Sequence, residues 1–283
     1  MNLTDPNQIK ALMAANGVRF SKSLGQNFLI APWVPEKIAD SAELNENDGV
    51  LEIGPGVGVL TRELSERAAQ VLSVELDESL APILRVTLMD RPNCRVIYGD
   101  ALKQNLPALC REHFGEERPW KLCANLPYNV TTPLLTAILE SRAFETVTVM
   151  IQKEVAERIC AKAGCGEYGA FTLLVNWYAE PEKLFDVSPD CFLPQPKVTS
   201  SVIRLRRREQ PPVEVADEAW FFRVVRAAFN QRRKALPNAL SSGLGLEKSS
   251  ITEALTALDL PADIRGERLT GEQFAKLSDL LKK

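Results

Sequence analysis

The segment "NLPYN" at residues 125–129 places an amide side chain, a backbone carbonyl and an aromatic ring next to one another. Pro127 disfavours the helical conformation for Leu126, so the Leu126 carbonyl is expected in an extended segment where it can accept a hydrogen bond. Asn125 offers a second acceptor through its side-chain oxygen, and Tyr128 offers a flat aromatic face. Together they fit an amino group on a planar ring, although an ordinary transition from strand to loop produces the same letters.

Two acceptors on one exocyclic amine would orient the lone pair of its nitrogen toward an electrophile and favour a pyramidal nitrogen. This contribution is positioning and electrostatic stabilisation, and it is needed most in the transition state. A methyl sulfonium beside the amine would complete a methyl transfer. No strong base is required, because the alkylated amine becomes acidic and can lose its proton to water.

A glycine-rich turn follows the first apolar run in "VLEIGPGVGVLTREL" and contains Gly54, Gly56 and Gly58. Glycine lets the backbone turn tightly and approach a ligand closely. The dinucleotide fingerprint G-x-G-x-x-G requires its third glycine at the position that Val59 occupies. The turn therefore predicts a ligand site, but its spacing is wrong for the commonest NAD loop.

Two acidic residues follow the next apolar runs. Glu75 lies 21 residues after Gly54, where a carboxylate can accept hydrogen bonds from both hydroxyls of a ribose. Asp100 in "YGDAL" follows the third run and could receive an adenine amine. NAD and S-adenosylmethionine (SAM) would both satisfy Glu75, and each acid alone is also typical of a surface cap. Ligand-type residues after three successive runs nevertheless favour a nucleoside pocket.

The elements that must position these residues are apolar runs alternating with helix-like segments. Such runs predict parallel strands buried on both faces, and hence a doubly wound, Rossmann-like α/β sheet. Two later candidates, at residues 176–185 and 197–207, are expected to add an antiparallel edge. The five runs lie at residues 49–54, 70–76, 94–99, 121–126 and 146–152.

The sequence changes character after Arg208. The proline pair in "EQPPVEVADEAW" breaks regular structure, and Asp217 can cap a helix that follows. Helical spacing without any strand candidate continues to the end. We therefore predict two domains, a catalytic domain at residues 1–208 and a small all-helical domain at residues 209–283.

Charge is distributed unevenly along the chain, whose net charge is -3. Between residues 204 and 234, nine basic and four acidic residues give a local charge of +5. This excess suggests a polyanionic partner, although a solvated helix face is an equally good reading of charge alone. The residues of this region that we expect to contact such a polyanion, RNA being one example, are Arg206, Arg207, Arg232, Arg233 and Lys234.

Composition narrows the class of protein. Of the 283 residues, 45% are hydrophobic and 25% charged, the balance of a globular protein that buries a core.

The beginning of the chain does not resemble a signal peptide, and no apolar stretch approaches the roughly 20 residues that span a bilayer, so we expect a cytoplasmic protein. The six cysteines include no C-x-x-C pair and there is one histidine, so we expect neither a metal site nor disulfides.

Several motifs together resemble the KsgA (RsmA) family of ribosomal RNA adenine N6-dimethyltransferases. The similarity runs from about residue 20 to the C-terminus. The motifs are "GQNFL", "EIGPGVGVLT", "NLPYN", "QKEVAERI", "FLPQPKVTS" and "FNQRRKAL".

The resemblance implies a class I SAM-dependent methyltransferase and a role for each matching residue. Residues 125–128 would serve the target adenine, with Tyr128 stacking on it and Phe192 on the other face of the base. The substrate implied is small-subunit (16S) rRNA within a pre-ribosomal 30S particle, bound by a monomer and methylated twice at each of two adjacent adenosines in a hairpin near its 3′ end. The residues implied to hold SAM, with the turn glycine Gly56 added, are Asn27, Leu29, Gly54, Gly56, Glu75, Asp100 and Asn125.

Three alternatives remain. The erythromycin-resistance methylases share the catalytic core and dimethylate large-subunit (23S) rRNA, but "FNQRRKAL" favours the small-subunit family. A non-catalytic rRNA-binding assembly factor would have a decayed pocket, whereas its residues are all present here. An NAD oxidoreductase would leave both "NLPY" and the basic region unexplained.

Overall fold

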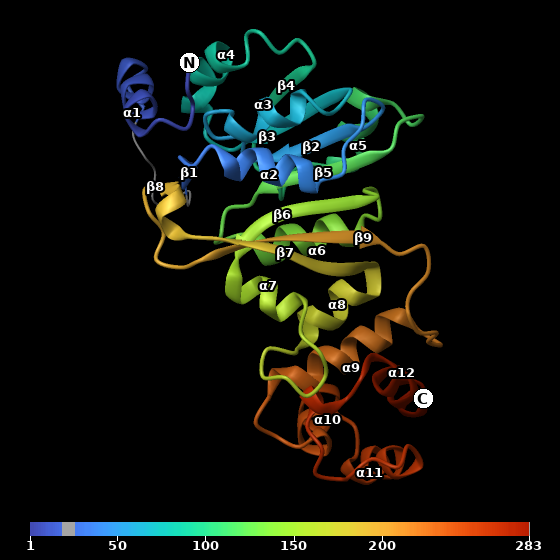
Figure 1. Cartoon of the computed structure of the whole chain (residues 1–283). Coiled ribbons are helices and arrows are strands. Elements are labelled where there is room, and N and C mark those ends of the chain that lie inside the picture. Colours follow the sequence, from blue (N-terminus) through green and yellow to red (C-terminus); the bar gives the residue numbers. More distant parts are fainter. Residues whose placement is uncertain (19–25, 283) are drawn as a thin grey trace. The chain divides into compact units, whose positions relative to one another are not determined.

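The computed structural model describes residues 1–18 and 26–282. The chain forms two compact units (Figure 1). The first comprises Met1–Ala156 and Ala179–Arg207, and the second comprises Glu157–Tyr178 and Arg208–Lys283. The sequence analysis divided the chain after residue 208, whereas the second unit contains residues 157–178 as well as the segment that begins at Arg208.

Within the described part of the first unit, seven strands form one sheet in the order β4-β3-β2-β5-β6-β9-β7 (Figure 1). Strands β2 to β6 pair in parallel, and β9 pairs antiparallel with both β6 and β7. The predicted Rossmann-like sheet with an antiparallel edge is confirmed. Its strands are β2 (Gly49–Ile53), β3 (Gln70–Glu75), β4 (Cys94–Tyr98), β5 (Trp120–Asn125), β6 (Thr146–Gln152), β7 (Ala179–Val187) and β9 (Ser200–Arg207).

Helices cover both faces of this sheet because its central strands are apolar on both sides. All five residues of β2 are buried. Val50 belongs to a core cluster that includes residues of α2 and α3, whereas a side chain at the neighbouring Gly49 would meet the ring of Phe114 in α5 at 2.5 Å. Successive strand residues point to opposite faces, so α5 lies on the face opposite α2 and α3.

The remaining elements of the first unit include a second, two-stranded sheet in which Leu29 of β1 pairs with Phe192 of β8. Strand β1 is Phe28–Leu29 and β8 is Phe192–Leu193. The helices are α1 (Pro6–Ala15), α2 (Trp33–Ser41), α3 (Val59–Ser65), α4 (Ala81–Thr87), α5 (Leu106–Phe114) and α6 (Thr131–Glu140), and α7 (Lys153–Ile159) contains the boundary between the units. The described part of this unit also contains two 3-10 turns, Glu78–Leu80 and Pro189–Cys191.

One predicted strand begins too early. Residues 176–178 were assigned to an edge strand, but they form the end of α8, and β7 begins only at Ala179. The aromatic and polar composition of residues 176–178 fits a strand as well as it fits a helix. The packing of Trp177 against Phe221 and Phe222 within the second unit favours the helix.

The described part of the second unit is helical, as predicted. Asp217 caps α9 by accepting a hydrogen bond from the Trp220 backbone N–H at 3.0 Å. The helical spacing that was expected to continue to the end of the chain is interrupted after Asn230, where α9 ends, and resumes at Leu236, where α10 starts. The helices are α8 (Ala170–Tyr178), α9 (Glu218–Asn230), α10 (Leu236–Leu244), α11 (Lys248–Ala257) and α12 (Gly271–Leu281), with a 3-10 turn at Gly266–Arg268.

Among residues 1–18 and 26–282, none of the helices combines the length and apolar character needed to cross a bilayer.

Candidate active site

The site lies where the order of the strands reverses. After β2 the chain moves outward to β3 and β4, and it then returns to form β5 on the other side of β2. The β2–β5 pairing ends at Leu51 and Leu122, whereas β2 remains paired with β3 up to Ile53. The strands therefore part at their carboxyl ends, and such a crevice is where open α/β sheets bind ligands.

The glycine turn after β2 forms one wall. Gly54 has φ +72° and Gly56 has φ +60°, values that residues with a side chain rarely adopt. A Cβ on Gly56 would lie 2.9 Å from the ring of Phe28, so the β1 segment approaches this turn closely. The turn needs glycine for both its backbone conformation and this approach.

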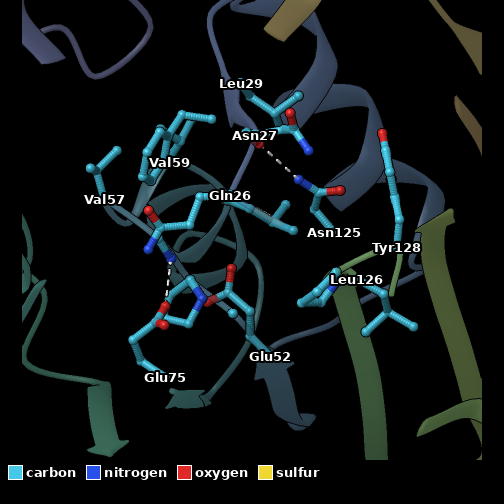
Figure 2. A pocket seen from close by; sticks show the side chains of 16 residues that line it. Gln26, Asn27, Leu29, Glu52, Val57, Val59, Glu75, Asn125, Leu126 and Tyr128 are labelled. Carbon is cyan, nitrogen blue, oxygen red and sulfur yellow. Dashed lines mark hydrogen bonds between the residues drawn. The ribbon is translucent and has the colours of Figure 1, made fainter. Parts of the chain in front are cut away.

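Two adjoining cavities occupy the crevice. The first, of about 70 Å³, is lined by residues from β1, the glycine turn and residues 125–128 (Figure 2). The second, of about 140 Å³, extends toward β4 and shares Gly54, Glu75 and Pro127 with the first. Six predicted cofactor residues, Asn27, Leu29, Gly54, Gly56, Glu75 and Asn125, line the first cavity, and Asp100 lines the second.

Glu75 sits at the junction of the two cavities. One carboxylate oxygen accepts from the Gly56 backbone N–H at 3.1 Å and the other from the Asp77 backbone N–H at 2.9 Å. Its side chain is 6% exposed, and burial raises the pKa of its carboxyl group against the lowering effect of these hydrogen bonds. Each carboxylate oxygen has a further lone pair, so Glu75 can hold the glycine turn and still accept from a ligand.

The second cavity is lined by apolar side chains and by one carboxylate that follows β4, that of Asp100. Leu76 and Leu102 line it and are 52% and 41% exposed. Asp100 begins the turn after β4, and its carboxylate accepts from the Leu102 backbone N–H at 3.0 Å. Two leucines and a carboxylate suit a planar heterocycle that carries an amine.

Residues 125–128 form the opposite wall. The Asn125 side-chain N–H donates to the Asn27 carbonyl at 3.4 Å, which turns the amide toward β1 (Figure 2). The Pro127 carbonyl accepts from the Thr131 hydroxyl at 3.0 Å. By contrast, within the described residues no hydrogen bond reaches the Asn125 amide oxygen or the Leu126 carbonyl. These are the two acceptors that the sequence analysis expected to be available.

Phe192 is not brought to either cavity. Its side chain is 2% exposed and packs in the core with Leu29, Val34 and Ile38. The expected stacking of Phe192 on the target base is therefore not seen in this arrangement, and it stays a prediction. The physical reason is the pairing of β8 with β1, which turns Phe192 inward.

The predicted RNA-binding pair in β9 lies far from this edge of the sheet. Arg206 is paired in register with Thr146, the first residue of β6, whereas the site is at the other end of that strand. Both terminal nitrogens of Arg206 donate to the Glu43 carboxylate, and Arg207 donates to the Arg142 carbonyl at 2.7 Å. These contacts give both guanidinium groups structural partners.

In the second unit, residues 231–235 connect α9 and α10, so the other predicted basic residues lie on a turn rather than a helix face. Arg232, Arg233 and Lys234 are exposed. The guanidinium group of Arg232 donates to the carbonyls of Gly166 and Tyr168. Arg232 therefore helps to hold residues 166–168 as well as presenting charge.

Two polar residues that line the first cavity, Gln26 and Glu52, were not predicted although both lie in quoted motifs. Gln26 donates to the Asp77 carboxylate at 2.7 Å and so ties the β1 segment to the turn after β3. Glu52 is 1% exposed, and one of its oxygens accepts from the hydroxyls of Thr61 at 2.6 Å and Ser73 at 2.8 Å. An acidic residue inside an otherwise apolar strand was the signal that could have identified Glu52.

Within the described ranges, no group of three or more histidine, cysteine, aspartate or glutamate side chains is arranged to hold a metal ion.

Comparison with known proteins shows extensive similarity. A family model described as "Ribosomal RNA adenine dimethylase" matches residues 17–283. The chain is 48% identical over 262 residues to "Ribosomal RNA small subunit methyltransferase A" of Clostridium acetobutylicum, covering 92% of this chain and 93% of that one. It is 44% identical to the protein of the same name from Shouchella clausii, with 99% and 96% covered.

Solved structures show the same architecture. The 23S rRNA methyltransferase ErmE matches with a TM-score of 0.68 and 31% identity, covering 90% of this chain and 99% of that one. A dimethyladenosine transferase from Plasmodium falciparum matches with a TM-score of 0.71 and 26% identity, covering 88% and 95%.

The buried Glu52 predicts a pH-dependent stability. Burial raises its pKa to about 7, whereas in the unfolded chain it titrates near 4.5. Between these values the folded state binds more protons than the unfolded state, so the contribution of Glu52 to the free energy of unfolding falls as pH rises through this window. We expect Glu52→Gln to remove this loss, which amounts to roughly 3 kcal/mol for such a shift.

Urea denaturation of both proteins at pH 5 and pH 8 measures this effect. The free energy of unfolding of the wild type should fall relative to that of Glu52→Gln between the two pH values. A difference that does not change with pH would show that Glu52 is ionised in the folded protein throughout.

Proposed function

The chain belongs to the ribosomal RNA adenine dimethylase family, and from this premise we propose how its pocket performs the reaction. It is a SAM-dependent rRNA adenine dimethyltransferase of the small-subunit type, which transfers methyl groups to adenine N6. The observation that carries the assignment of residues is the pair of unused acceptors at Asn125 and Leu126, which lie beside a pocket suited to a nucleoside.

The residues present fit SAM. Gly54 lines both cavities, and the nearest atoms to a Cβ built there belong to Pro127 at 4.0 Å, an ordinary van der Waals distance. Glu75 faces both cavities and would accept from the ribose hydroxyls. Asp100 would receive the adenine amine between the apolar side chains of Leu76 and Leu102.

The first cavity would take the methionine part of SAM. It is lined by the backbone of the glycine turn and by Asn27, Leu29, Glu52 and Asn125. SAM supplies an electrophilic methyl group, and the cationic character of its sulfonium suits a wall that contains buried carboxyl groups. The Asn125 amide would be shared between the cofactor and the target base.

The target adenine would enter between Tyr128 and the parted strands. In the first methyl transfer the Asn125 amide oxygen and the Leu126 carbonyl would each accept one N–H of the exocyclic amine, and in the second transfer one of them would accept the N–H that remains, which aims the nitrogen lone pair at the methyl carbon. Bound SAM would supply the methyl group and leave as the neutral thioether, and positive charge would grow on the amine nitrogen, where the Asn125 and Leu126 acceptors would stabilise it. The proton then leaves to water, so the chain needs no strong base at this position.

We extend the proposal to the partners and the setting. The substrate is rRNA within a pre-ribosomal 30S particle, at two adjacent adenosines of a hairpin near the 3′ end. The enzyme acts as a monomer in the cytoplasm. The exposed turn at residues 232–234 contacts RNA phosphates, while the ion-paired Arg206 and the carbonyl-bound Arg207 contribute less.

Nucleoside analysis tests the function directly. The enzyme is incubated with methyl-labelled SAM and small subunits that lack the modification, and the RNA is digested to nucleosides. Labelled N6,N6-dimethyladenosine from small subunits supports the proposal. Labelling of large subunits instead would select the erythromycin-resistance type of activity, which ErmE represents among the similar structures, and RNA binding without any labelling would indicate an assembly factor.

The role proposed for Glu75 predicts a loss of cofactor affinity. Glu75→Ala should weaken SAM binding by about 1.5 to 3 kcal/mol, the range for hydrogen bonds to a charged group. Calorimetry on the folded variant measures this loss. Glu78 is a nearby exposed acid, so Glu78→Ala serves as the control and should bind SAM normally. Unchanged affinity of Glu75→Ala would remove this residue from the pocket.

The role proposed for residues 232–234 predicts a change in salt dependence. Replacing Arg232, Arg233 and Lys234 with glutamine should reduce the slope of log affinity for RNA against log salt by about 2 to 3, because fewer counterions are released. A control triple variant replaces three exposed lysines elsewhere in the second unit, Lys248, Lys276 and Lys282. Equal slopes for wild type and the first variant would make this turn a solvated surface only.

A further inference from the structure

Tyr128 makes a contact that the reaction as described does not use. Its phenolic oxygen lies 2.6 Å from the hydroxyl oxygen of Ser200, 72 residues later in the chain. Tyr128 follows β5 and lines the first cavity, whereas Ser200 is the first residue of β9. The hydrogen bond therefore joins the wall of the pocket to a different strand of the sheet.

Ser200 is a rigid anchor. Its side chain is fully buried, and it is paired in register with Gln152 of β6 on one side and Val187 of β7 on the other. The residue before it is also held, since the Lys153 backbone N–H donates to the Thr199 carbonyl at 3.0 Å. A hydroxyl placed by two ladders at this buried point has little freedom to move.

We propose that Ser200 is a positioning residue, which holds the Tyr128 ring in the orientation that stacks on the target adenine. This inference rests on the proposed function. It concerns the hydrogen bond at the tip of the ring and not the ring face that would meet the base.

The geometry explains why such an anchor is needed. Tyr128 lies on a turn outside any helix or strand and is half-buried, so packing alone restrains its two side-chain torsions incompletely. A bond at the far end of the ring fixes both torsions together. Stacking is sensitive to the orientation of the ring, and small misplacements of reacting groups slow a methyl transfer strongly.

The same contact accounts for the hydroxyl of Tyr128. It is engaged with Ser200 at the edge of the sheet and is therefore not committed to the base, whose amine is served by Asn125 and Leu126. It also links residues 125–128 with "FLPQPKVTS", two of the motifs that identify the family in the sequence.

A double-mutant cycle tests the inference. Tyr128→Phe and Ser200→Ala each remove the hydrogen bond while keeping the aromatic ring. We expect each single variant to lower the single-turnover methylation rate at saturating SAM and RNA by about 2- to 10-fold, the effect of one ordinary hydrogen bond. The double variant should be no slower than the slower single variant, because both changes remove the same interaction.

Ser201 provides a matched control. It is the adjacent serine, equally buried, and its hydroxyl donates to the Asp186 carboxylate at 2.7 Å on the side away from Tyr128. Ser201→Ala should keep the wild-type rate, even where its melting temperature falls as much as that of Ser200→Ala. In all three serine and tyrosine variants the affinity for SAM should be unchanged, since the effect is on turnover.

The results that overturn the inference are distinct from failure of the proposed function. If the wild type forms no dimethyladenosine, the function itself is wrong. If the wild type is active, then a wild-type rate in Tyr128→Phe, multiplicative losses in the double variant, or an equal loss in Ser201→Ala each contradict the role of Ser200. Should Ser200→Ala fail to fold, Tyr128→Phe and Ser200→Cys, which retains the volume and a weak partner, carry the same test.

Discussion

The parting of β2 from β5 is the constraint on which the site depends. Strand β2 follows β3 to Ile53, and β5 follows β6 to Asn125, but the ladder between β2 and β5 stops at Leu51 and Leu122. Because each strand stays bound to its outer neighbour, the crevice between them is fixed by two ladders and not by a flexible loop. The glycine turn continues the chain from the end of β2, and residues 125–128 lie at the end of β5, on the other side of the crevice. The residues proposed to bind the cofactor and those proposed to bind the target base therefore lie next to each other.

The walls of this crevice carry unusual electrostatics for a buried region. Glu52 and Glu75 are almost fully buried, and desolvation raises the pKa of both. Hydroxyl and backbone donors offset part of that cost, and a cationic ligand would offset more. In the free protein, burial makes the ionised form of these two carboxyl groups unfavourable. A positively charged cofactor bound beside them would make the ionised form favourable.

Much of this was readable in the sequence, and the physical reasons are specific. Strands β2 to β6 could be predicted because they are buried on both faces and therefore appear in the sequence as continuous apolar runs. The acidic residues that follow two of these runs, Glu75 and Asp100, line the cavities of the crevice. The burial of Phe192 and the ion pair of Arg206 with Glu43 could not be read, because each depends on the register of segments more than 160 residues apart. The end of α9 at Asn230 was missed since "NQRRKAL" contains neither glycine nor proline. The contact between Ser200 and Tyr128 appears only when β9 is placed beside β6.

The central claim is that Asn125 and Leu126 grip the target amine in the transition state, and the single-turnover rate of N6 methylation by Asn125→Ala tests it most directly. The measurement is made at saturating SAM, because Asn125 also lines the cofactor cavity. We expect the rate to fall by about 10- to 100-fold, as for loss of a hydrogen bond to a group that gains charge, with RNA affinity little changed. A rate restored fully by excess SAM, or a loss confined to RNA affinity, would contradict the account.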